Sequence, residues 1–388
     1  MNSHIKLPVS DGTFEQYRLS GTPVGPLREN ITFNRIAFSA AHVVADPRGA
    51  NELNESPCID WERTIAYRRY LIGAGFGIAE AMDTAQRGMG LNWSTAKELI
   101  RRTISETRDL PGALIFSGCG TDQLAASDAA STADVIRAYE EQLSAIQALG
   151  GRVILMSSRA LARVARTAED YKTVYKAVLA NADKPVILHW LGSMFDPELA
   201  GYWGSDTFEG ALDTCLEIIR ENAAKIDGIK ISLLDKDKEI RMRRLLPPGV
   251  NMYTGDDFNY PGLIEGDEQG HSHALLGIFD AIAPVASHAL QALGKGDNAR
   301  YHALMDPTVP LSRLIFRAPT QYYKTGVVFL AYLNGHQDHF IMLGGHHAFR
   351  PLPYFVELFR LADRAGLLRD PERAAARMQG FLRQYGID

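Results

Sequence analysis

The stretch "DGIKISL" (227–233), followed by "GVNMYTG" (249–255), contains the two apolar runs that best indicate the fold. Each run has the length of a strand and is bounded by glycine or polar residues. Strands of a parallel sheet read as nearly continuous apolar runs because helices cover both faces of the sheet. The two runs therefore predict strands of a buried parallel sheet, and the first of them contains one charged side chain, Lys230.

Other segments repeat this pattern along the chain and bring the number of candidate strands to eight. The six further runs are "NRIAFSA" (34–40), "FGIAEAM" (76–82), "GALIFSG" (112–118), "GRVILMS" (151–157), "KPVILHW" (184–190) and "HALLGIF" (273–279). Segments with helical spacing lie between most of them, at 60–75, 92–106, 131–150 and 207–225. Asn92 can cap the second of these helices, and Ser131 or Thr132 the third.

This alternation of strands and helices predicts an α/β fold with a parallel sheet. Eight units fit a closed (β/α)₈ TIM barrel, a fold of typically about 250 residues. An open doubly wound sheet is the alternative. Helical spacing continues after the eighth run, so we predict three parts: an N-terminal arm (1–30), the barrel (31–285) and a C-terminal helical extension (286–388).

Composition narrows the class of partner. The chain has 388 residues, of which 46% are hydrophobic, and its formal charge is 41 − 46 = −5. Without a basic patch it has no electrostatic attraction for nucleic acid, so a small molecule is the expected partner. The N-terminal residues do not resemble a signal peptide, and no apolar run approaches the roughly 20 residues that span a bilayer. We therefore expect a cytoplasmic protein that binds neither nucleic acid nor membrane.

In a (β/α)₈ barrel, the residues that follow the carboxyl ends of the strands form the active site. We predict Lys230, His189 and Thr84 as catalytic residues. The predicted substrate-binding residues are polar side chains at the same strand ends: His42, Asp83, Gln86, Ser232 and Asp256. The histidine suits proton transfer near neutral pH. The carboxylates and amide suit hydroxyl groups of a sugar-like substrate.

Lys230 is the most informative of these residues. Burial disfavours the charged form of an amine, which leaves free amine to attack a carbonyl carbon. The iminium that results is an electron sink and stabilises the carbanion formed when an adjacent C–C or C–H bond breaks. No organic cofactor is needed for this chemistry. The alternative is a structural lysine that forms an ion pair with Glu80 or Asp256.

Several motifs, in order, resemble those of the dihydrodipicolinate synthase and N-acetylneuraminate lyase family. "IDGIKISLLD" followed by "NMYTGDD" is similar to the lysine strand of the family and the strand after it. Further resemblance covers roughly residues 30–370, through "LIGAGFGIAEAMDTAQRGMGLNWSTAKELIR", "GALIFSGCGTDQ", "KPVILHW" and "RPLPYFVELFRLADRAGLL". The chain most resembles a divergent branch of the family, a dihydrodipicolinate-synthase-like domain of unknown function.

The resemblance implies that Lys230 forms the Schiff base and that Thr84 lies at or next to a turn that binds the carboxylate of a 2-oxo acid. It also implies a homo-oligomer. Four features depart from the family. His189 replaces the catalytic tyrosine of strand five, and Asp83 stands where a carboxylate-binding turn prefers glycine or a hydroxyl. The tyrosine that follows strand four is absent from "MSSRAL", and the arginine expected after strand five is absent from "HWLGSMF". A carboxylate beside Asp83 would meet like charge.

We therefore predict a Schiff-base lyase, an aldolase or dehydratase, for a small oxygenated carbonyl compound such as a keto-sugar or a sugar-derived keto acid. The first alternative is a metal-dependent barrel isomerase, epimerase or hydrolase with His42, Glu80, His189 and Asp256 around an ion. The second is a non-catalytic sugar-binding barrel. A separate histidine cluster, His336, His339, His346 and His347, is a further candidate for metal binding.

Overall fold

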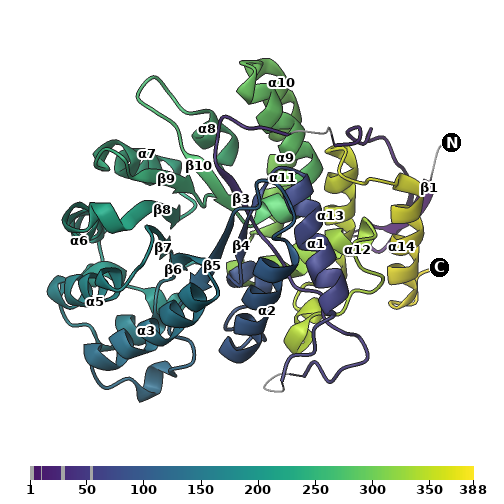
Figure 1. The fold of residues 1–388 in the computed structure, drawn as a ribbon. Coiled ribbons are helices and arrows are strands. Elements are labelled where there is room, and N and C mark those ends of the chain that lie inside the picture. The colour runs from purple at the N-terminus through teal and green to yellow at the C-terminus, as the bar shows by residue number, and fades with distance from the viewer. Residues whose placement is uncertain (1–3, 10, 28–30, 53–55) are drawn as a thin grey trace. The chain divides into compact units, whose positions relative to one another are not determined.

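The structure, a computed structural model, describes residues 4–9, 11–27, 31–52 and 56–388. The chain divides into two compact units (Figure 1). We call residues 35–41 and 76–277 the barrel unit, and residues 1–34, 42–75 and 278–388 the helical unit. Each unit is made of segments that are far apart in the sequence. No helix among the described residues combines the length and the apolar character needed to cross a membrane.

Eight parallel strands form a closed barrel in the order β10-β3-β4-β5-β6-β7-β8-β9, which confirms the predicted TIM barrel. Every strand overlaps one of the eight apolar runs identified in the sequence. The strands are β3 (Ala37–Ala40), β4 (Gly77–Glu80), β5 (Ile115–Cys119), β6 (Arg152–Leu155), β7 (Val186–Leu191), β8 (Ile226–Ser232), β9 (Asn251–Thr254) and β10 (His273–Leu276).

Alternate residues of the strands fill the interior of the barrel. One buried cluster draws side chains from seven of the eight strands, all but β8, or from residues next to them: Phe38, Ala40, Ala79, Met82, Phe116, Ile154, Ile187, Tyr253 and Leu275. Strand side chains alternate between the two faces of a sheet, so His189, two residues after Ile187, also points inward. The apolar cluster is thus the floor below the polar residues at the carboxyl ends of the strands.

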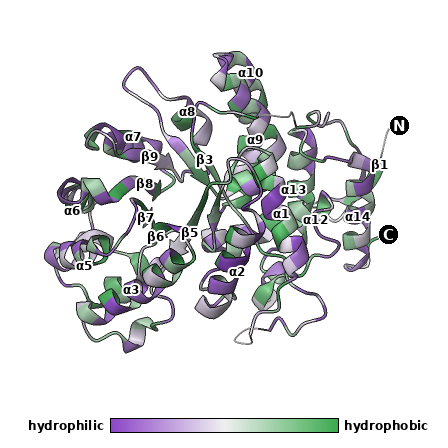
Figure 2. Cartoon of the chain, viewed as in Figure 1, coloured by the Kyte–Doolittle hydropathy of each residue, from purple (hydrophilic) through white to green (hydrophobic). Residues whose placement is uncertain are grey.

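The helices of the barrel unit follow the strands in sequence. They are α2 (Trp93–Glu106), α3 (Thr132–Ala148), α4 (Arg159–Val164), α5 (Ala168–Ala180), α6 (Phe208–Glu221), α7 (Lys236–Leu245) and α8 (Tyr260–Glu265), with short 3₁₀ turns at Asp83–Ala85 (η1), Ala126–Asp128, Pro197–Leu199, Tyr202–Gly204 and Ala223–Lys225. Asn92 and Ser131 accept backbone N–H bonds at the starts of α2 and α3, as predicted. Figure 2 shows α7 as mainly hydrophilic, in contrast to strand β3.

The helical unit contains a hairpin of two strands and seven helices among its described residues. They are β1 (His4–Pro8), β2 (Phe14–Arg18), α1 (Trp61–Gly73), α9 (Ile278–Gly294), α10 (Asn298–Met305), α11 (Val309–Ile315), α12 (Tyr323–Leu333), α13 (Leu352–Arg364) and α14 (Pro371–Arg383), with 3₁₀ turns at Asp306–Thr308, Thr320–Tyr322 and Leu343–Ala348. The described part of the predicted arm thus holds a hairpin. Residues 1–3, 10 and 28–30 of that arm lie outside the described residues.

The buried carboxylate of Asp363, on α13, holds the segment that follows the hairpin. It accepts hydrogen bonds from Tyr17 Oη at 2.8 Å, from the Ser20 N–H at 2.9 Å and from the Gly21 N–H at 3.1 Å. A carboxylate that is satisfied by three donors is stable when buried. The N-terminal segment is therefore an integral part of the helical unit.

Candidate active site

Lys230 and His189 lie side by side on neighbouring strands of the barrel. The register of β7 and β8 places His189 opposite Lys230, so both side chains enter the barrel interior at the same level. Both are buried, with 1% of His189 and 7% of Lys230 exposed. The structure therefore brings together the two residues that the sequence predicts as the central catalytic pair.

The ammonium of Lys230 has no hydrogen bond or ion pair with any residue in the part of the chain that the structure describes. Burial lowers its pKa, and the charges of Asp83 and Asp257 partly oppose this effect. Glu80 and Asp256, the partners proposed for a structural lysine, bind other groups. A buried amine without a fixed partner is suited to a chemical role, since a structural lysine would be expected to have its charge compensated.

Glu80 shows why that ion pair does not form. Its carboxylate accepts hydrogen bonds from the Ala81 N–H at 2.8 Å and from Thr103 Oγ1, on α2, at 2.6 Å. Glu80 therefore points to the helix layer and away from the barrel interior.

His189 is neutral at physiological pH. Burial, and to a lesser extent the charge of Lys230, lowers its pKa well below the ordinary value. Its Nε2 atom lies 3.3 Å from Ser232 Oγ, while its Nδ1 atom is buried and has no hydrogen-bond partner among the described residues. A neutral imidazole with an unoccupied nitrogen can accept or relay a proton.

Gly255, which the sequence analysis did not single out, leaves the space that Lys230 occupies. A Cβ atom at this position would lie 2.3 Å from Ser232 Oγ and 2.8 Å from Lys230 Cε. Both distances are far below van der Waals contact, so a larger residue would displace the two side chains. The glycine of the "TGDD" motif therefore has a steric function next to the lysine.

The turn after β4 carries three of the predicted site residues. Asp83, Thr84 and Gln86 lie in or next to η1, where Thr84 and Gln86 are buried and Asp83 is partly exposed. Gln86 adopts a left-handed conformation (φ 64°) and donates its side-chain amide to the Met89 carbonyl at 3.0 Å. This hydrogen bond stabilises the turn, and contact of Gln86 with a substrate stays a prediction.

Arg87 fixes this turn to the neighbouring strand end. The guanidinium is buried and donates to the carbonyls of Ala81 and Gly118 at 3.2 Å. It also forms a bidentate ion pair with Asp122, at 2.7 and 2.8 Å. Such planar two-point pairing is specific to arginine. Arg87 therefore positions the segment that carries Asp83 and Thr84.

Asp256 organises the loop after β9. Its carboxylate accepts bonds from the backbone N–H groups of Phe258 and Asn259, at 2.8 and 3.0 Å, and from the Asn259 side chain at 2.8 Å. It is 1% exposed. Asp256 thus has a turn-forming role in the structure, whereas its neighbour Asp257 acts electrostatically on Lys230.

A buried carboxyl on α7 supports this loop from outside the barrel. Glu239 accepts hydrogen bonds from Thr254 Oγ1 at 2.9 Å and Ser272 Oγ at 2.7 Å, and Thr254 Oγ1 accepts from the Asp256 N–H at 3.2 Å. Burial, together with the nearby Asp256, raises the pKa of Glu239 to about 8, although the hydroxyl bonds oppose the shift. The group is therefore mostly protonated at neutral pH.

We expect the stability of the protein to fall between pH 6 and pH 8 because of Glu239. Its folded pKa of about 8 exceeds the ordinary value of 4.5, so its stabilising effect is full below about pH 4.5 and is lost as pH rises through about 8. The expected loss is roughly 2 kcal/mol between pH 6 and 8. Glu239→Gln should flatten this dependence in urea unfolding at pH 6, 7 and 8. An unchanged slope would show that Glu239 is ionised in the folded protein.

His42, a predicted substrate-binding residue, belongs to the helical unit and is fully buried there. Its Nδ1 atom lies 2.8 Å from Asp280 Oδ2, and its backbone N–H donates to the same oxygen at 2.8 Å. Tyr67 Oη donates to the Asp280 carbonyl at 2.6 Å. The structure therefore gives His42 a buried histidine–aspartate pair, which the sequence analysis did not predict because Asp280 is 238 residues away.

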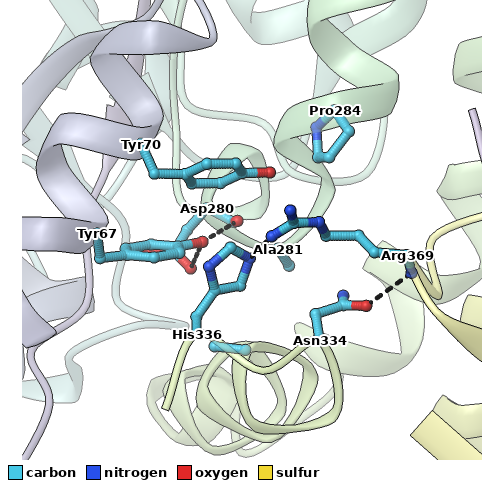
Figure 3. A pocket seen from close by; sticks show the side chains of 9 residues that line it. Tyr67, Tyr70, Asp280, Ala281, Pro284, Asn334, His336 and Arg369 are labelled. Atoms are coloured by element: carbon cyan, nitrogen blue, oxygen red, sulfur yellow. Dashed lines mark hydrogen bonds between the residues drawn. The ribbon is translucent and has the colours of Figure 1, made fainter. Parts of the chain in front are cut away.

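Of the histidine cluster, His336 packs beside Tyr67 and lines a small cavity together with Asp280 (Figure 3). Its ring lies 4.8 Å from that of Tyr67 and 4.5 Å from that of Tyr70, next to Arg369 and a cavity of about 10 Å³. A cavity of that size holds about one water molecule. Burial, with smaller contributions from Arg369 and His42, lowers the pKa of His336 to about 3. His336 is thus an aromatic packing partner that stays neutral.

The other three histidines make separate local contacts. His339 Nδ1 accepts from the Ile341 N–H, His347 Nδ1 accepts from the Met342 N–H, and His346 packs on Phe349. Within the described residues, no three His, Cys, Asp or Glu side chains gather in a way that could hold a metal ion. The four histidines therefore do not form a metal site among the residues that the structure describes.

The fold and the site define an eight-stranded parallel barrel with a buried lysine on one of its strands. The chain belongs to a protein family described as "Protein of unknown function (DUF993)", which matches residues 5–387. No curated protein matches the sequence.

Solved structures show which known proteins share the fold. YagE, a prophage protein of the dihydrodipicolinic acid synthase family from E. coli K12, is 16% identical, with a TM-score of 0.66 over 87% of this chain and all of its own. The 4-hydroxy-tetrahydrodipicolinate synthase of Methylacidiphilum fumariolicum SolV is 18% identical, with a TM-score of 0.64 over 89% of this chain and 98% of its own. The dihydrodipicolinate synthase of Aquifex aeolicus is 12% identical, with a TM-score of 0.64 over 86% and 99%. The fold is therefore that of a divergent dihydrodipicolinate-synthase-like branch, as the motifs predicted.

Proposed function

We propose that the protein is a Schiff-base lyase, of aldolase or dehydratase type, that acts on a small oxygenated carbonyl compound. The observation that supports this proposal most is Lys230, a buried amine with a lowered pKa and no fixed partner among the described residues, beside a neutral histidine. The likeness to the fold of the dihydrodipicolinate synthase family supports the same chemistry. In YagE the solved complex contains pyruvate.

In the proposed reaction, the Lys230 amine attacks the substrate carbonyl carbon and forms a C–N bond, and loss of water gives an iminium. When the bond between the α and β carbons of the iminium breaks, its electron pair forms a double bond from the α carbon to the former carbonyl carbon. The C=N π electrons move to the nitrogen, which gives an enamine. His189 accepts the proton of the hydroxyl whose oxygen becomes the new carbonyl. The same histidine returns a proton to the enamine carbon, and hydrolysis by water releases the product and frees Lys230.

This assignment can be tested without knowledge of the natural substrate. A methyl ketone such as hydroxyacetone, bound as an iminium, loses a methyl proton to form the enamine and exchanges it with solvent. In D₂O the protein should therefore accelerate deuterium incorporation into the methyl group, measured by proton NMR. The absence of acceleration with hydroxyacetone, pyruvate and a panel of ketoses would contradict the proposal.

His189→Gln should separate the two stages of the reaction. Because Lys230 remains, reduction with borohydride should still trap the lysine adduct. Proton transfer should slow by about 10²- to 10⁴-fold, the usual contribution of a general acid–base group. Trapping and deuterium exchange are measured on the same sample, and Asn222→Gln, at the partly exposed C-cap of α6, serves as the control. Equal losses of trapping and exchange in His189→Gln would instead assign His189 a structural role.

A further inference from the structure

The hydroxyl of Ser232 contacts the ring of His189. Ser232 is the last residue of β8 and is 2% exposed, and its Oγ atom lies 3.3 Å from His189 Nε2. Among the described residues this is the one hydrogen bond of the imidazole ring, because the buried Nδ1 atom has no partner there. The tip of the ring is therefore joined to a serine on the strand that carries the lysine.

Ser232 also lies close to the end of the Lys230 side chain. The two residues are two positions apart on one strand, so both side chains point into the barrel, and Ser232 is nearer to the carboxyl end, where the active site of a barrel opens. A Cβ atom on Gly255 would lie 2.3 Å from Ser232 Oγ and 2.8 Å from Lys230 Cε, so both atoms are within 2.8 Å of one point. A substrate bonded to the lysine nitrogen, one bond beyond Cε, is therefore held near the serine hydroxyl.

Main-chain hydrogen bonds on both sides fix the backbone at Ser232. The Gly192 N–H donates to the Ser232 carbonyl at 3.0 Å, and the Gly255 N–H donates to the Ile231 carbonyl at 2.9 Å. Leu191 pairs with Ser232 in the register of β7 and β8. The hydroxyl is therefore attached to a rigid strand end, the kind of support that holds a catalytic group in position.

A serine hydroxyl in this position can pass a proton, because it has one hydrogen to donate and two lone pairs that accept. When the neutral His189 carries its hydrogen on Nδ1, Ser232 Oγ donates to Nε2 and its lone pairs remain open to a hydrogen of the substrate. Nδ1 is the ring nitrogen nearer to the backbone of β7, whereas Nε2 is directed at β8. The route through Ser232 is therefore the one that leads from the lysine to the imidazole.

We infer that Ser232 and His189 form a proton relay, in which the serine hydroxyl carries the proton between the lysine-bound substrate and Nε2. This inference rests on the proposed function and gives Ser232 a role beyond the predicted binding of substrate. When the iminium loses a proton from its α carbon, that proton passes to Ser232 Oγ while the Oγ proton passes to Nε2. The C–H electron pair forms the enamine double bond, and the C=N π electrons move to the nitrogen. The positive charge thus moves from the iminium to the imidazole, and the reverse transfers return the proton.

Ser232→Ala should keep the lysine adduct and lose the proton transfer. Lys230 remains in place, so borohydride should still trap hydroxyacetone on it in the full-length protein. Deuterium exchange should fall by about 10²- to 10⁴-fold, as expected for His189→Gln. Because the two residues act in series, the double variant Ser232→Ala/His189→Gln should exchange no more slowly than the slower single variant. Peptide mass spectrometry measures the trapping, and proton NMR measures the exchange.

Ser157→Ala is the matched control for the loss of a hydroxyl beside His189. Ser157 Oγ donates to the backbone carbonyl of His189 at 2.8 Å and so contacts the same residue away from its ring. This substitution should leave both trapping and exchange unchanged.

A solvent isotope effect separates a relay from a serine that only orients the ring. The probe is hydroxyacetone tritiated in its methyl group, and the release of tritium is measured in H₂O and in D₂O on the plateau of the pH profile. In a relay the exchangeable hydrogen of Ser232 moves in the same step as the substrate hydrogen, so release should be slower in D₂O. Direct transfer to the imidazole moves the substrate hydrogen alone and gives equal rates.

The outcomes bear separately on the relay and on the Schiff base. Exchange that survives in Ser232→Ala, losses that multiply in the double variant, or tritium release at equal rates in both solvents would overturn the relay and leave the Schiff-base function intact. Equal losses of trapping and exchange in Ser232→Ala would also overturn it, because they would assign the serine to the placement of Lys230. A wild-type protein that neither traps hydroxyacetone on Lys230 nor exchanges its methyl protons would contradict the Schiff-base function, and with it the inference.

Discussion

Replacing Lys230 with alanine is expected to reduce deuterium exchange of hydroxyacetone by at least about 10³-fold, to the rate without protein. The physical reason is that the proposed iminium forms on the Lys230 amine, and a loss of this size corresponds to about 4 kcal/mol of transition-state stabilisation. The fold should persist, because Lys230 makes no hydrogen bond or ion pair with the rest of the described chain. Proton NMR in D₂O measures the exchange, and circular dichroism checks the fold.

Lys324 provides a matched control for this substitution. It is also a buried lysine, with 3% of its surface exposed, but its ammonium donates to the Gln321 carbonyl at 2.9 Å. Lys324→Ala should therefore keep the deuterium exchange, although loss of buried contacts is expected to lower stability. Exchange that survives in Lys230→Ala, or that disappears equally in both variants, would contradict the role assigned to Lys230.

Gly255→Ala is expected to have the second largest effect. The added Cβ would lie 2.3 Å from Ser232 Oγ, 2.7 Å from the Ile231 carbonyl oxygen and 2.8 Å from Lys230 Cε. Because a backbone atom is among these neighbours, the clash cannot be relieved by a side-chain rotation alone. We expect a loss of about 3 kcal/mol in the free energy of unfolding. Labelling of Lys230 by hydroxyacetone and borohydride should fall by roughly 100-fold, because the amine is displaced.

The control for this glycine lies a few residues away. Gly262, on α8, has no atom within 4 Å of the position that a Cβ would occupy. Gly262→Ala should stabilise the helix by about 0.5 to 1 kcal/mol, because alanine loses less backbone entropy. Urea unfolding measures both variants. If the Gly255→Ala protein were as stable as the wild type and as readily labelled at Lys230, the added Cβ atom would not displace the lysine. That result would contradict the steric function of Gly255.

The barrel could be predicted from the sequence because its signal is repeated. Each of β3 to β10 overlaps an apolar run, and helical segments separate most of the runs. Segments with weaker patterns were harder to predict from the sequence. The charged segment that forms α7, "KDKEIRMRRL", offers little apolar periodicity, and the hairpin of β1 and β2 lies in residues predicted as an arm. In both cases tertiary packing, more than local pattern, determines the structure.

The candidate site was predictable to the extent that strand order determines it. His189 and Lys230 end up as neighbours because they occupy equivalent positions on consecutive parallel strands. The sequence did not reveal Glu239, which lies on a mostly polar helix and looks like a solvent-exposed carboxylate. His42 was predicted from its place at a strand end, whereas its buried contact with Asp280 joins residues that are far apart in the sequence. Such pairings follow from the fold and not from local spacing.

The central claim is that Lys230 forms a covalent iminium with a carbonyl compound. The most direct test is peptide mapping by mass spectrometry after borohydride reduction of the full-length protein with hydroxyacetone and a panel of ketoses. We predict a single modified lysine, Lys230, with no modification of Lys324 or Lys225 under the same conditions. An unmodified Lys230 across the panel, or modification spread over surface lysines in proportion to their exposure, would contradict the claim.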